Sequence, residues 1–269
     1  MGWIEQAVVG FDTETTGVDV GTDRIVSAAL VRRHGTSTTV RTWLVDPGVP
    51  IPTGASDIHG ITTEHARAHG RHPVGALEEV AQALVQALEN GEPLVAFNAC
   101  YDLSLLDAEL RRHGLATLPE RLGREVRVVI DPLVLDRHLD RYRRGKRRLG
   151  NLCEHYGVPA SAHLHTADVD VLATLDVLHA LLRRFPEAAR MSLEDLHDLQ
   201  VTAHRTWADG FNRWRTSQGL TGPGADDGWP VRLSETAPTL PTPLTVPSQT
   251  AVLPTAVLPA VVPDLVAAG

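Results

Sequence analysis

The sequence predicts an α/β domain built around a mixed β-sheet. Short apolar runs come first with only a turn between two of them, and later runs alternate with segments of helical periodicity. A meander followed by strand–helix alternation is typical of a sheet with both antiparallel and parallel neighbours. From about Thr216 prolines recur, and they block both helices and central strands.

Five segments are expected to be strands, each a short run rich in apolar residues. They are residues 7–12, 24–33, 38–45, 94–98 and 126–131. The residues Arg33-His34-Gly35-Thr36 have the composition of a hairpin turn between the second and third strands. A proline-rich loop, residues 47–53, follows the third strand.

Six segments are expected to be helices. Leu77, Val80, Leu84 and Leu88 recur at helical spacing in the first of them, and Gly91 lies just past its end. The six are residues 73–88, 101–113, 132–139, 149–156, 167–184 and 193–214.

The chain has 269 residues, which is enough for one domain with an appendage. We expect a folded domain over residues 1–215, with a motif-bearing core at about 7–185 and a C-terminal helix at about 192–215. Residues 216–269 are then a proline-rich tail that is disordered or extended.

Composition indicates a cytoplasmic protein without a membrane partner. The N-terminus lacks the basic and apolar regions of a secretory signal, and prolines interrupt the apolar stretch at residues 251–262. Cys100 and Cys153 are not in a C-x-x-C pair, which argues against a zinc knuckle or a disulfide framework.

The net charge of −8 argues mildly against a broad basic face that holds nucleic acid. Basic residues nevertheless concentrate in residues 141–148, which is either a solvated loop or an edge that contacts phosphates. Trp207, Phe211 and Trp214 also allow two interpretations. Their helical spacing favours packing against the core over a platform for stacking bases.

Acidic residues mark the end of the first strand. Alternation along a strand places Asp12 and Glu14 on the same side. They are either exposed acids at a strand end or two oxygen ligands of a divalent metal ion.

Two further acids follow strand or loop segments, each in the first turn of an expected helix. Asp102 comes shortly after the fourth strand, and Asp170 follows His165 by five residues. Each acid alone could simply complement a helix dipole. His163 and Asp168 have the same spacing as His165 and Asp170, so they form a competing pair.

Together these segments resemble the DEDD superfamily of 3′–5′ exonucleases, in its histidine-bearing, DnaQ-like branch, which includes proofreading subunits of bacterial DNA polymerase III. The resemblance covers residues 8–182 roughly, and the proline-rich tail is outside it. The matching positions are Phe11-Asp12-Thr13-Glu14-Thr15-Thr16-Gly17, then Ile58-His59-Gly60-Ile61-Thr62, then Asn98, Asp102 and Leu103, and finally His165, Ala167 and Asp170.

The resemblance implies an RNase H-like fold and two Mg²⁺ or Mn²⁺ ions. It implies hydrolysis of the terminal phosphodiester with release of nucleoside monophosphates, a reaction that two hard cations held by carboxylates support. Asp12, Glu14, Asp102 and Asp170 are then the metal ligands and His165 the general base. The resemblance also places Thr15, Thr16, His59, Ile61 and Asn98 in the pocket for the terminal nucleotide.

The resemblance favours His165 with Asp170 over the competing pair, because Ala167 supplies the small residue two positions after the histidine. Helical periodicity agrees, since the face that continues from Asp170 is apolar, whereas the face from Asp168 reaches Asp176 and His179.

We therefore expect an exonuclease that acts on the 3′ end of single-stranded DNA in proofreading or repair. The alternatives are an exonuclease that processes RNA or degrades oligoribonucleotides, and a catalytically silent module that binds nucleic acid or a polymerase. A DNA polymerase or another replication or repair protein is a candidate partner for the tail.

Overall fold

A five-stranded mixed sheet forms the centre of the first of two compact units, which spans Met1–Leu233. The structure, a computed structural model, describes residues 3, 6–159 and 166–232. The second unit, Ser234–Gly269, therefore lies outside the described residues.

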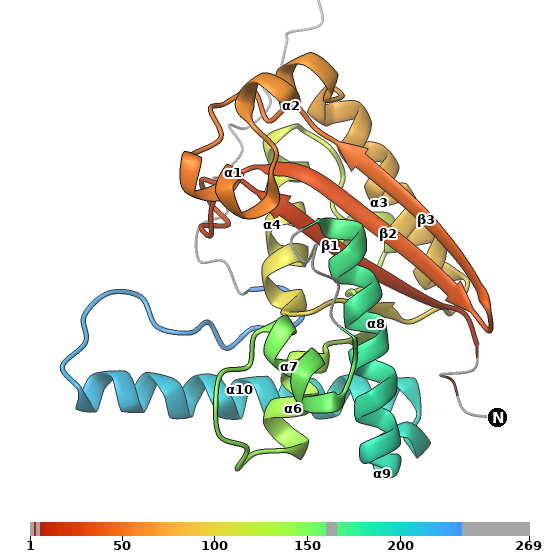
Figure 1. The fold of residues 1–269 in the computed structure, drawn as a ribbon, viewed down its shortest axis with the longest axis vertical. Coiled ribbons are helices and arrows are strands. Elements are labelled where there is room, and N and C mark those ends of the chain that lie inside the picture. The colour runs from red at the N-terminus through yellow and green to blue at the C-terminus, as the bar shows by residue number, and fades with distance from the viewer. Residues whose placement is uncertain (1–2, 4–5, 160–165, 233–269) are drawn as a thin grey trace, which may run out of the picture. The chain divides into compact units, whose positions relative to one another are not determined.

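The strands lie in the order β3-β2-β1-β4-β5, and Figure 1 shows β3, β2 and β1 side by side. The three long strands form an antiparallel meander, while β4 and β5 run parallel to β1. Their bounds are β1 Val8–Thr15, β2 Ile25–His34, β3 Ser37–Leu44, β4 Leu94–Val95 and β5 Val129–Ile130. The predicted mixed sheet is confirmed, although the last two strands pair over only two residues each.

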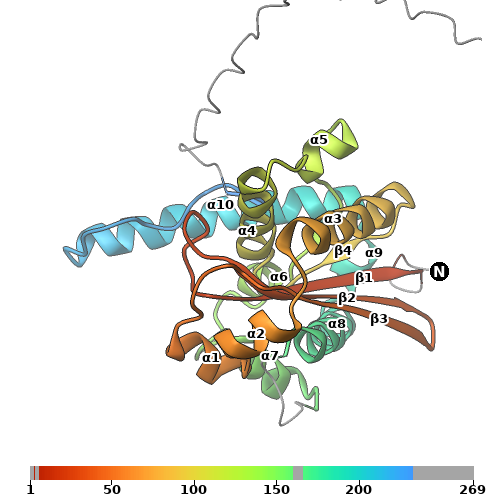
Figure 2. The same cartoon turned by 90° about the horizontal axis from the view of Figure 1, so that it is seen from above.

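Helices cover both faces of this sheet (Figure 2). Val9 and Phe11 of β1 belong to the apolar cluster formed with α3 (Pro73–Glu89) and α4 (Ala99–Arg112). Val8 belongs to the cluster on the opposite face, formed with α8 (Ala167–Arg184). The period of two along β1 thus divides its side chains between two cores.

Gly10 lets α8 approach β1 closely. A Cβ atom at this position would lie 2.3 Å from Cγ1 of Val171, so any side chain there would push the helix away. Since Val171 follows Asp170, this contact also fixes the first turn of α8 beside β1.

All six predicted helices are present, and the structure adds four short ones that the sequence did not reveal. The additional helices are α1 (Thr53–His59), α2 (Thr63–His69), α5 (Leu118–Leu122) and α9 (Pro186–Arg190). The remaining helices are α6 (Pro132–Leu139), α7 (Leu149–Tyr156) and α10 (Leu193–Ser217). None of the described helices is long and apolar enough to cross a bilayer.

The folded unit continues beyond the boundary expected after residue 215. Trp229 is 6% exposed and joins the cluster around α3 and α4. The backbone N–H of Arg232 donates to Oγ of Ser104 at 2.8 Å, and the amide of Asn212 donates to the carbonyl of Ala225 at 2.8 Å. Residues 218–232 therefore belong to the first unit, and the tail begins later than the sequence indicated.

Candidate active site

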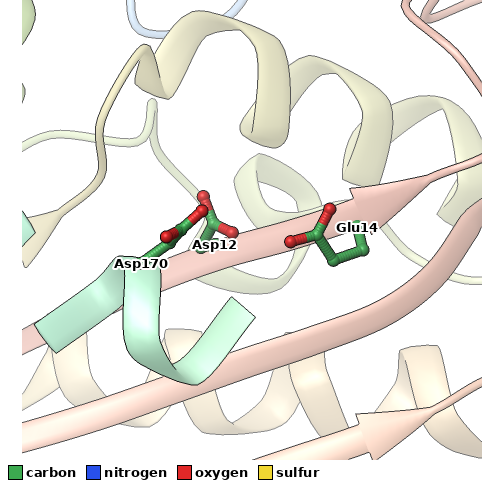
Figure 3. A group of neighbouring side chains, drawn as sticks. All are labelled: Asp12, Glu14 and Asp170. Carbon is green, nitrogen blue, oxygen red and sulfur yellow. The ribbon is translucent and has the colours of Figure 1, made fainter. Parts of the chain in front are cut away.

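Three carboxylates from two elements meet beside β1. Asp12 and Glu14 project from the same side of the strand, and Asp170 lies in the first turn of α8. One carboxylate oxygen from each residue lies within 4.8 Å of the other two (Figure 3). The alternation of β1 and the close approach of α8 at Gly10 produce this group, which we call the acidic triad.

Asp102 approaches the acidic triad from α4. It lies in the first turn of that helix and is 4% exposed. Its Oδ1 accepts hydrogen bonds from the backbone N–H and the hydroxyl of Thr13, at 3.1 and 2.6 Å. Thr13 stands between Asp12 and Glu14 on β1, so these bonds orient Asp102 from the strand that carries two of the other acids.

Burial and neighbouring charges raise the pKa values of three of these acids. Burial and the charges of Asp102 and Glu14 hold the pKa of Asp12 well above its ordinary value. Burial, Asp170 and Asp102 raise the pKa of Glu14 to about 8. Burial raises the pKa of Asp102 to about 7 despite the hydrogen bonds from Thr13.

The donor set fits divalent metal ions with a preference for oxygen. Within the described part of the chain, no arginine or lysine forms a salt bridge with Asp12, Glu14 or Asp102. Carboxylates alone are ligands that suit Mg²⁺ and Mn²⁺. A bound cation would also relieve the repulsion that raises these pKa values.

Asp131 holds the start of α4 in place, and sequence reasoning missed it. This residue is 1% exposed and accepts from the backbone N–H groups of Asn98 and Ala99, at 3.1 and 3.0 Å. Asn98 itself is exposed and has a φ of 61°, a left-handed conformation that an asparagine tolerates. An acid that follows a short strand and precedes Pro132 was the available signal.

Thr15 and Thr16 have different surroundings. The Thr15 hydroxyl donates to the carbonyl of Gly17 at 2.6 Å and lies 3.0 Å from the Tyr101 hydroxyl. The Thr16 hydroxyl donates to Oδ1 of Asp23 at 2.7 Å and accepts from the backbone of Arg24 at 3.0 Å. The Thr16 side chain thus stabilises the β1–β2 connection, and its hydroxyl is already engaged.

His59 and Ile61 lie together at the end of α1. The ring of His59 is 6% exposed, and its Nδ1 accepts from the backbone N–H of Ile61 at 3.1 Å. Burial lowers the pKa of His59, while the nearby backbone of Thr15 opposes the shift. Because Nδ1 accepts the bond from Ile61, a neutral ring carries its proton on the buried Nε2.

His165 and His163 both lie outside the described residues, so the choice between them stays a prediction. The acids of the two competing pairs do differ in the structure. Asp170 belongs to the acidic triad, and Asp168 does not. The face that continues from Asp170 through Thr174, Val177 and Leu181 is buried, whereas Asp176 is exposed.

Two arginines of the basic segment 141–148 bind a buried acid. Asp136 is fully buried and accepts from Arg143 at 3.0 Å, from Arg147, and from the Tyr156 hydroxyl at 2.8 Å. Burial opposes ionisation of Asp136, but these three donors outweigh it and lower the pKa. Neither Arg143 nor Arg147 is therefore a freely exposed cation.

A profile of the protein family described as "Exonuclease" matches residues 9–178. The chain belongs to this exonuclease family. The match contains Asp12, Glu14, Asp102 and Asp170, so the acids lie within the part that defines the family. The predicted membership of the DnaQ-like 3′–5′ exonuclease superfamily is confirmed.

Relatives of this exonuclease-family chain include long bacterial polymerases. It is 31% identical over 202 residues to the PolC-type DNA polymerase III of Streptococcus thermophilus, which covers 72% of this chain and 12% of the polymerase. A PolC-type DNA polymerase III of Lacticaseibacillus paracasei is 31% identical over 196 residues, covering 71% and 12%. The chain thus spans only about one eighth of these relatives' length.

Solved structures with the same fold include exonuclease I. One such structure has a TM-score of 0.59 and 20% identity, and covers 74% of this chain and 44% of its own. Exonuclease I of Methylocaldum szegediense gives a TM-score of 0.57 and 22% identity, covering 78% and 46%. E. coli exonuclease I in complex with a dT13 oligonucleotide gives a TM-score of 0.56 and 20% identity, and the match covers 68% of this chain and 43% of that one. The predicted RNase H-like fold is confirmed.

Proposed function

We propose that this protein is a metal-dependent 3′–5′ exonuclease that hydrolyses the terminal phosphodiester of DNA and releases nucleoside 5′-monophosphates in proofreading or repair. The observation that carries the proposal is the convergence of Asp12, Glu14 and Asp170, with Asp102 next to them. Asp12, Glu14 and Asp102 form no salt bridge with an arginine or lysine of the described residues, and carboxylates gathered in this way are costly unless cations bind them.

Each side chain of the site has a role in this proposal. Asp12, Glu14, Asp102 and Asp170 hold two divalent ions, Mg²⁺ or Mn²⁺. When bound, such ions stabilise the negative charge that develops on the transferred phosphate. Thr13 orients Asp102 through its two hydrogen bonds.

His165 takes the proton from the attacking water in this proposal, a role that rests on the family resemblance. Its place in the chain supports the assignment, because it precedes α8 by two residues and Asp170 by five. A histidine titrates near working pH, as a general base must.

The terminal nucleotide would lie between the start of α4 and the end of α1. Asn98, Thr15, His59 and Ile61 supply its surroundings, and the bond from the backbone N–H of Ile61 to Nδ1 fixes the His59 ring. Thr16 contributes through its backbone position, since its hydroxyl is engaged by Asp23 and Arg24.

DNA is the proposed substrate because the relatives are DNA polymerases and a structure with this fold contains a DNA oligonucleotide. The test compares digestion of matched 3′-labelled DNA and RNA, single- and double-stranded, with Mg²⁺ and with Mn²⁺. We expect single-stranded DNA to be shortened fastest from its 3′ end. Faster digestion of RNA would indicate an exoribonuclease instead. No digestion of any substrate would refute the proposed activity.

A DNA polymerase or another replication or repair protein is the proposed partner of the proline-rich tail. The closely similar segments Ala251-Val252-Leu253-Pro254 and Ala256-Val257-Leu258-Pro259 support this role, since extended apolar–proline segments bind grooves at low entropic cost. Co-purification of a replication protein with the full chain, and its loss on truncation after Leu233, would support the proposal. Identical partners for both forms would refute it.

A further inference from the structure

An aromatic ladder runs along one face of α10. The rings of Trp207 and Phe211 are stacked with an interplanar angle of 16° and centroids 5.5 Å apart, and Trp214 follows at 5.7 Å. The ring of His204 continues the ladder toward the sheet at 5.5 Å from Trp207. Trp214 is 51% exposed, which the interpretation as core packing does not explain.

The ladder lies on a part of α10 that projects beyond the sheet. Figures 1 and 2 both show the C-terminal half of the helix extending past β1, with the segment that follows it running back alongside. Trp207 and Phe211 are only half-buried. A large apolar surface on a projecting helix indicates a binding role when it is continuous.

A cavity lies between the start of α4 and the first rings of the ladder. It has a volume of about 440 Å³, and its wall is formed by the start of α4, by two rings of the ladder and by the segment that follows α10. Six of the lining residues are Asn98, Tyr101, His204, Trp207, Gly224 and Arg232. Tyr101 also lies 3.0 Å from the hydroxyl of Thr15 and directly precedes Asp102. A strand that leaves the site past Tyr101 would therefore reach the ladder.

Guanidinium groups accompany the rings. The Cζ atom of Arg137 lies 3.8 Å from the centroid of the Trp207 ring, and that of Arg215 lies 5.9 Å from the Phe211 ring. Arg232 lines the cavity together with Asp226, and Asp209 is an exposed acid on the same helix. Rings for bases and guanidinium groups for phosphates are the combination that binds single-stranded nucleic acid without sequence preference.

We propose that the aromatic ladder and its cavity bind the unpaired nucleotides on the 5′ side of the terminal nucleotide. The proposal rests on the proposed exonuclease function for the identity of the strand. The helical rise from Trp207 to Trp214 is about 10 Å, which matches roughly three stacked nucleotides. Rings alternating with cations favour this occupant over a protein partner, for which a more uniformly apolar face is expected.

The test measures binding without hydrolysis, in EDTA, by competition of unlabelled dT3 and dT12 against a fluorescein-labelled dT20. For the wild type, dT12 should compete at least about tenfold better than dT3, since only dT12 reaches the ladder. Trp214→Ala should weaken the binding of dT12 by roughly 5- to 100-fold, the range for one lost stacking contact. The same variant should weaken the binding of dT3 by less than about twofold. Trp214→Phe should restore most of the dT12 affinity.

Matched variants control for exposure and charge. Tyr142→Ala removes an aromatic side chain that is 88% exposed between α6 and α7, and it should leave both affinities unchanged. Arg215→Gln should flatten the salt dependence of dT12 binding, whereas Arg184→Gln, which removes a guanidinium 5.7 Å from the Phe185 ring, should not. Melting temperatures confirm that each variant is folded.

Three results would overturn the proposal: no loss with Trp214→Ala, equal losses for dT3 and dT12, or the same loss with Tyr142→Ala. The first of these would make the ladder a protein-docking surface. Failure of the proposed function is a separate outcome, because a protein that digests no 3′-labelled strand could still bind dT12 through Trp214. Likewise, an active exonuclease whose Trp214→Ala variant binds normally would refute this inference alone.

Discussion

Two acidic sites in this protein are stabilised in opposite ways. Asp136 has its cations built in, because Arg143 and Arg147 bind it and lower its pKa. Asp12 and Glu14 have no salt bridge among the described residues, and their pKa values are raised. The fold supplies arginines to Asp136 but none of the described arginines to Asp12 and Glu14. This difference is expected where the cation comes from solution.

The largest expected effect is on activity. Asp12→Asn should reduce exonuclease turnover by at least about 10³-fold, since it removes a charged ligand shared at the centre of the site. Its unfolding free energy should stay the same or rise, because repulsion from Asp102 and Glu14 is relieved. Gel assays on 3′-labelled DNA and thermal melts measure the two quantities.

Asp168→Asn is the matched control, since Asp168 lies on the same turn of α8 as Asp170 but outside the acidic triad. It should keep activity within a few-fold. A loss of activity in Asp168→Asn as large as that in Asp12→Asn would mean that the other histidine–aspartate pair serves the site.

The next effect is on stability. Asp136→Ala should lower the unfolding free energy by about 3–5 kcal/mol, since it leaves two partly buried guanidinium groups without their acid. Urea denaturation measures the change. Asp140→Asn, which removes the half-buried partner of the exposed His155, should cost less than about 1 kcal/mol. If both variants lowered the unfolding free energy equally, the salt bridges of Asp136 would be no more stabilising than the pair formed by Asp140 and His155.

The pH dependence of stability should have opposite signs at the two sites. A raised pKa means that stability is lost as pH rises from the ordinary carboxyl pKa to the raised one, so the melting temperature of the metal-free protein should fall between about pH 4 and 8, the upper limit being set by Asp102 (about 7) and Glu14 (about 8). Millimolar Mg²⁺ or Mn²⁺ should remove this decline. The lowered pKa of Asp136 acts in the acidic range, where stability is lost as pH falls. Wild-type melting that is flat above pH 6 without metal would contradict the assignment.

The smallest expected effect comes from removing the tail. Truncation after Leu233 should leave exonuclease rate and melting temperature unchanged, because the compact unit ends there. Truncation after Ser217 should lower the melting temperature by several degrees, since it removes the buried Trp229 and the hydrogen bonds of Arg232 and Ala225. Equal melting of both truncated forms would restore the boundary near residue 215.

Local patterns in the sequence predicted much of this architecture. Alternation along β1 placed Asp12 and Glu14 on one side, and the apolar stripe of α8 agreed with the family resemblance in favouring Asp170 over Asp168. Both are short-range regularities of a strand and a helix, so one sequence is enough to read them.

Features that depend on distant contacts could not be predicted. Asp131 stabilises the turn before α4 from more than thirty residues away, and nothing near Asn98 reveals this. Residues 218–232 are rich in glycine and have prolines, so their composition indicated a tail. The burial of Trp229 against α3 and α4 shows that they belong to the folded unit, and burial depends on tertiary contacts that composition does not reveal.

The central claim is that the acidic site takes its cations from solution, and a calorimetric Mn²⁺ titration at pH 7 tests it most directly. The titration is run in two buffers of different ionisation enthalpy, with Asp12→Asn and Asp136→Asn as the compared variants. We predict Mn²⁺ binding with release of protons, because Glu14 and Asp102 titrate at about 8 and about 7 in the metal-free protein. Binding should be lost in Asp12→Asn and kept in Asp136→Asn. Absence of Mn²⁺ binding to the wild type, or binding that Asp12→Asn leaves unchanged, would contradict the account.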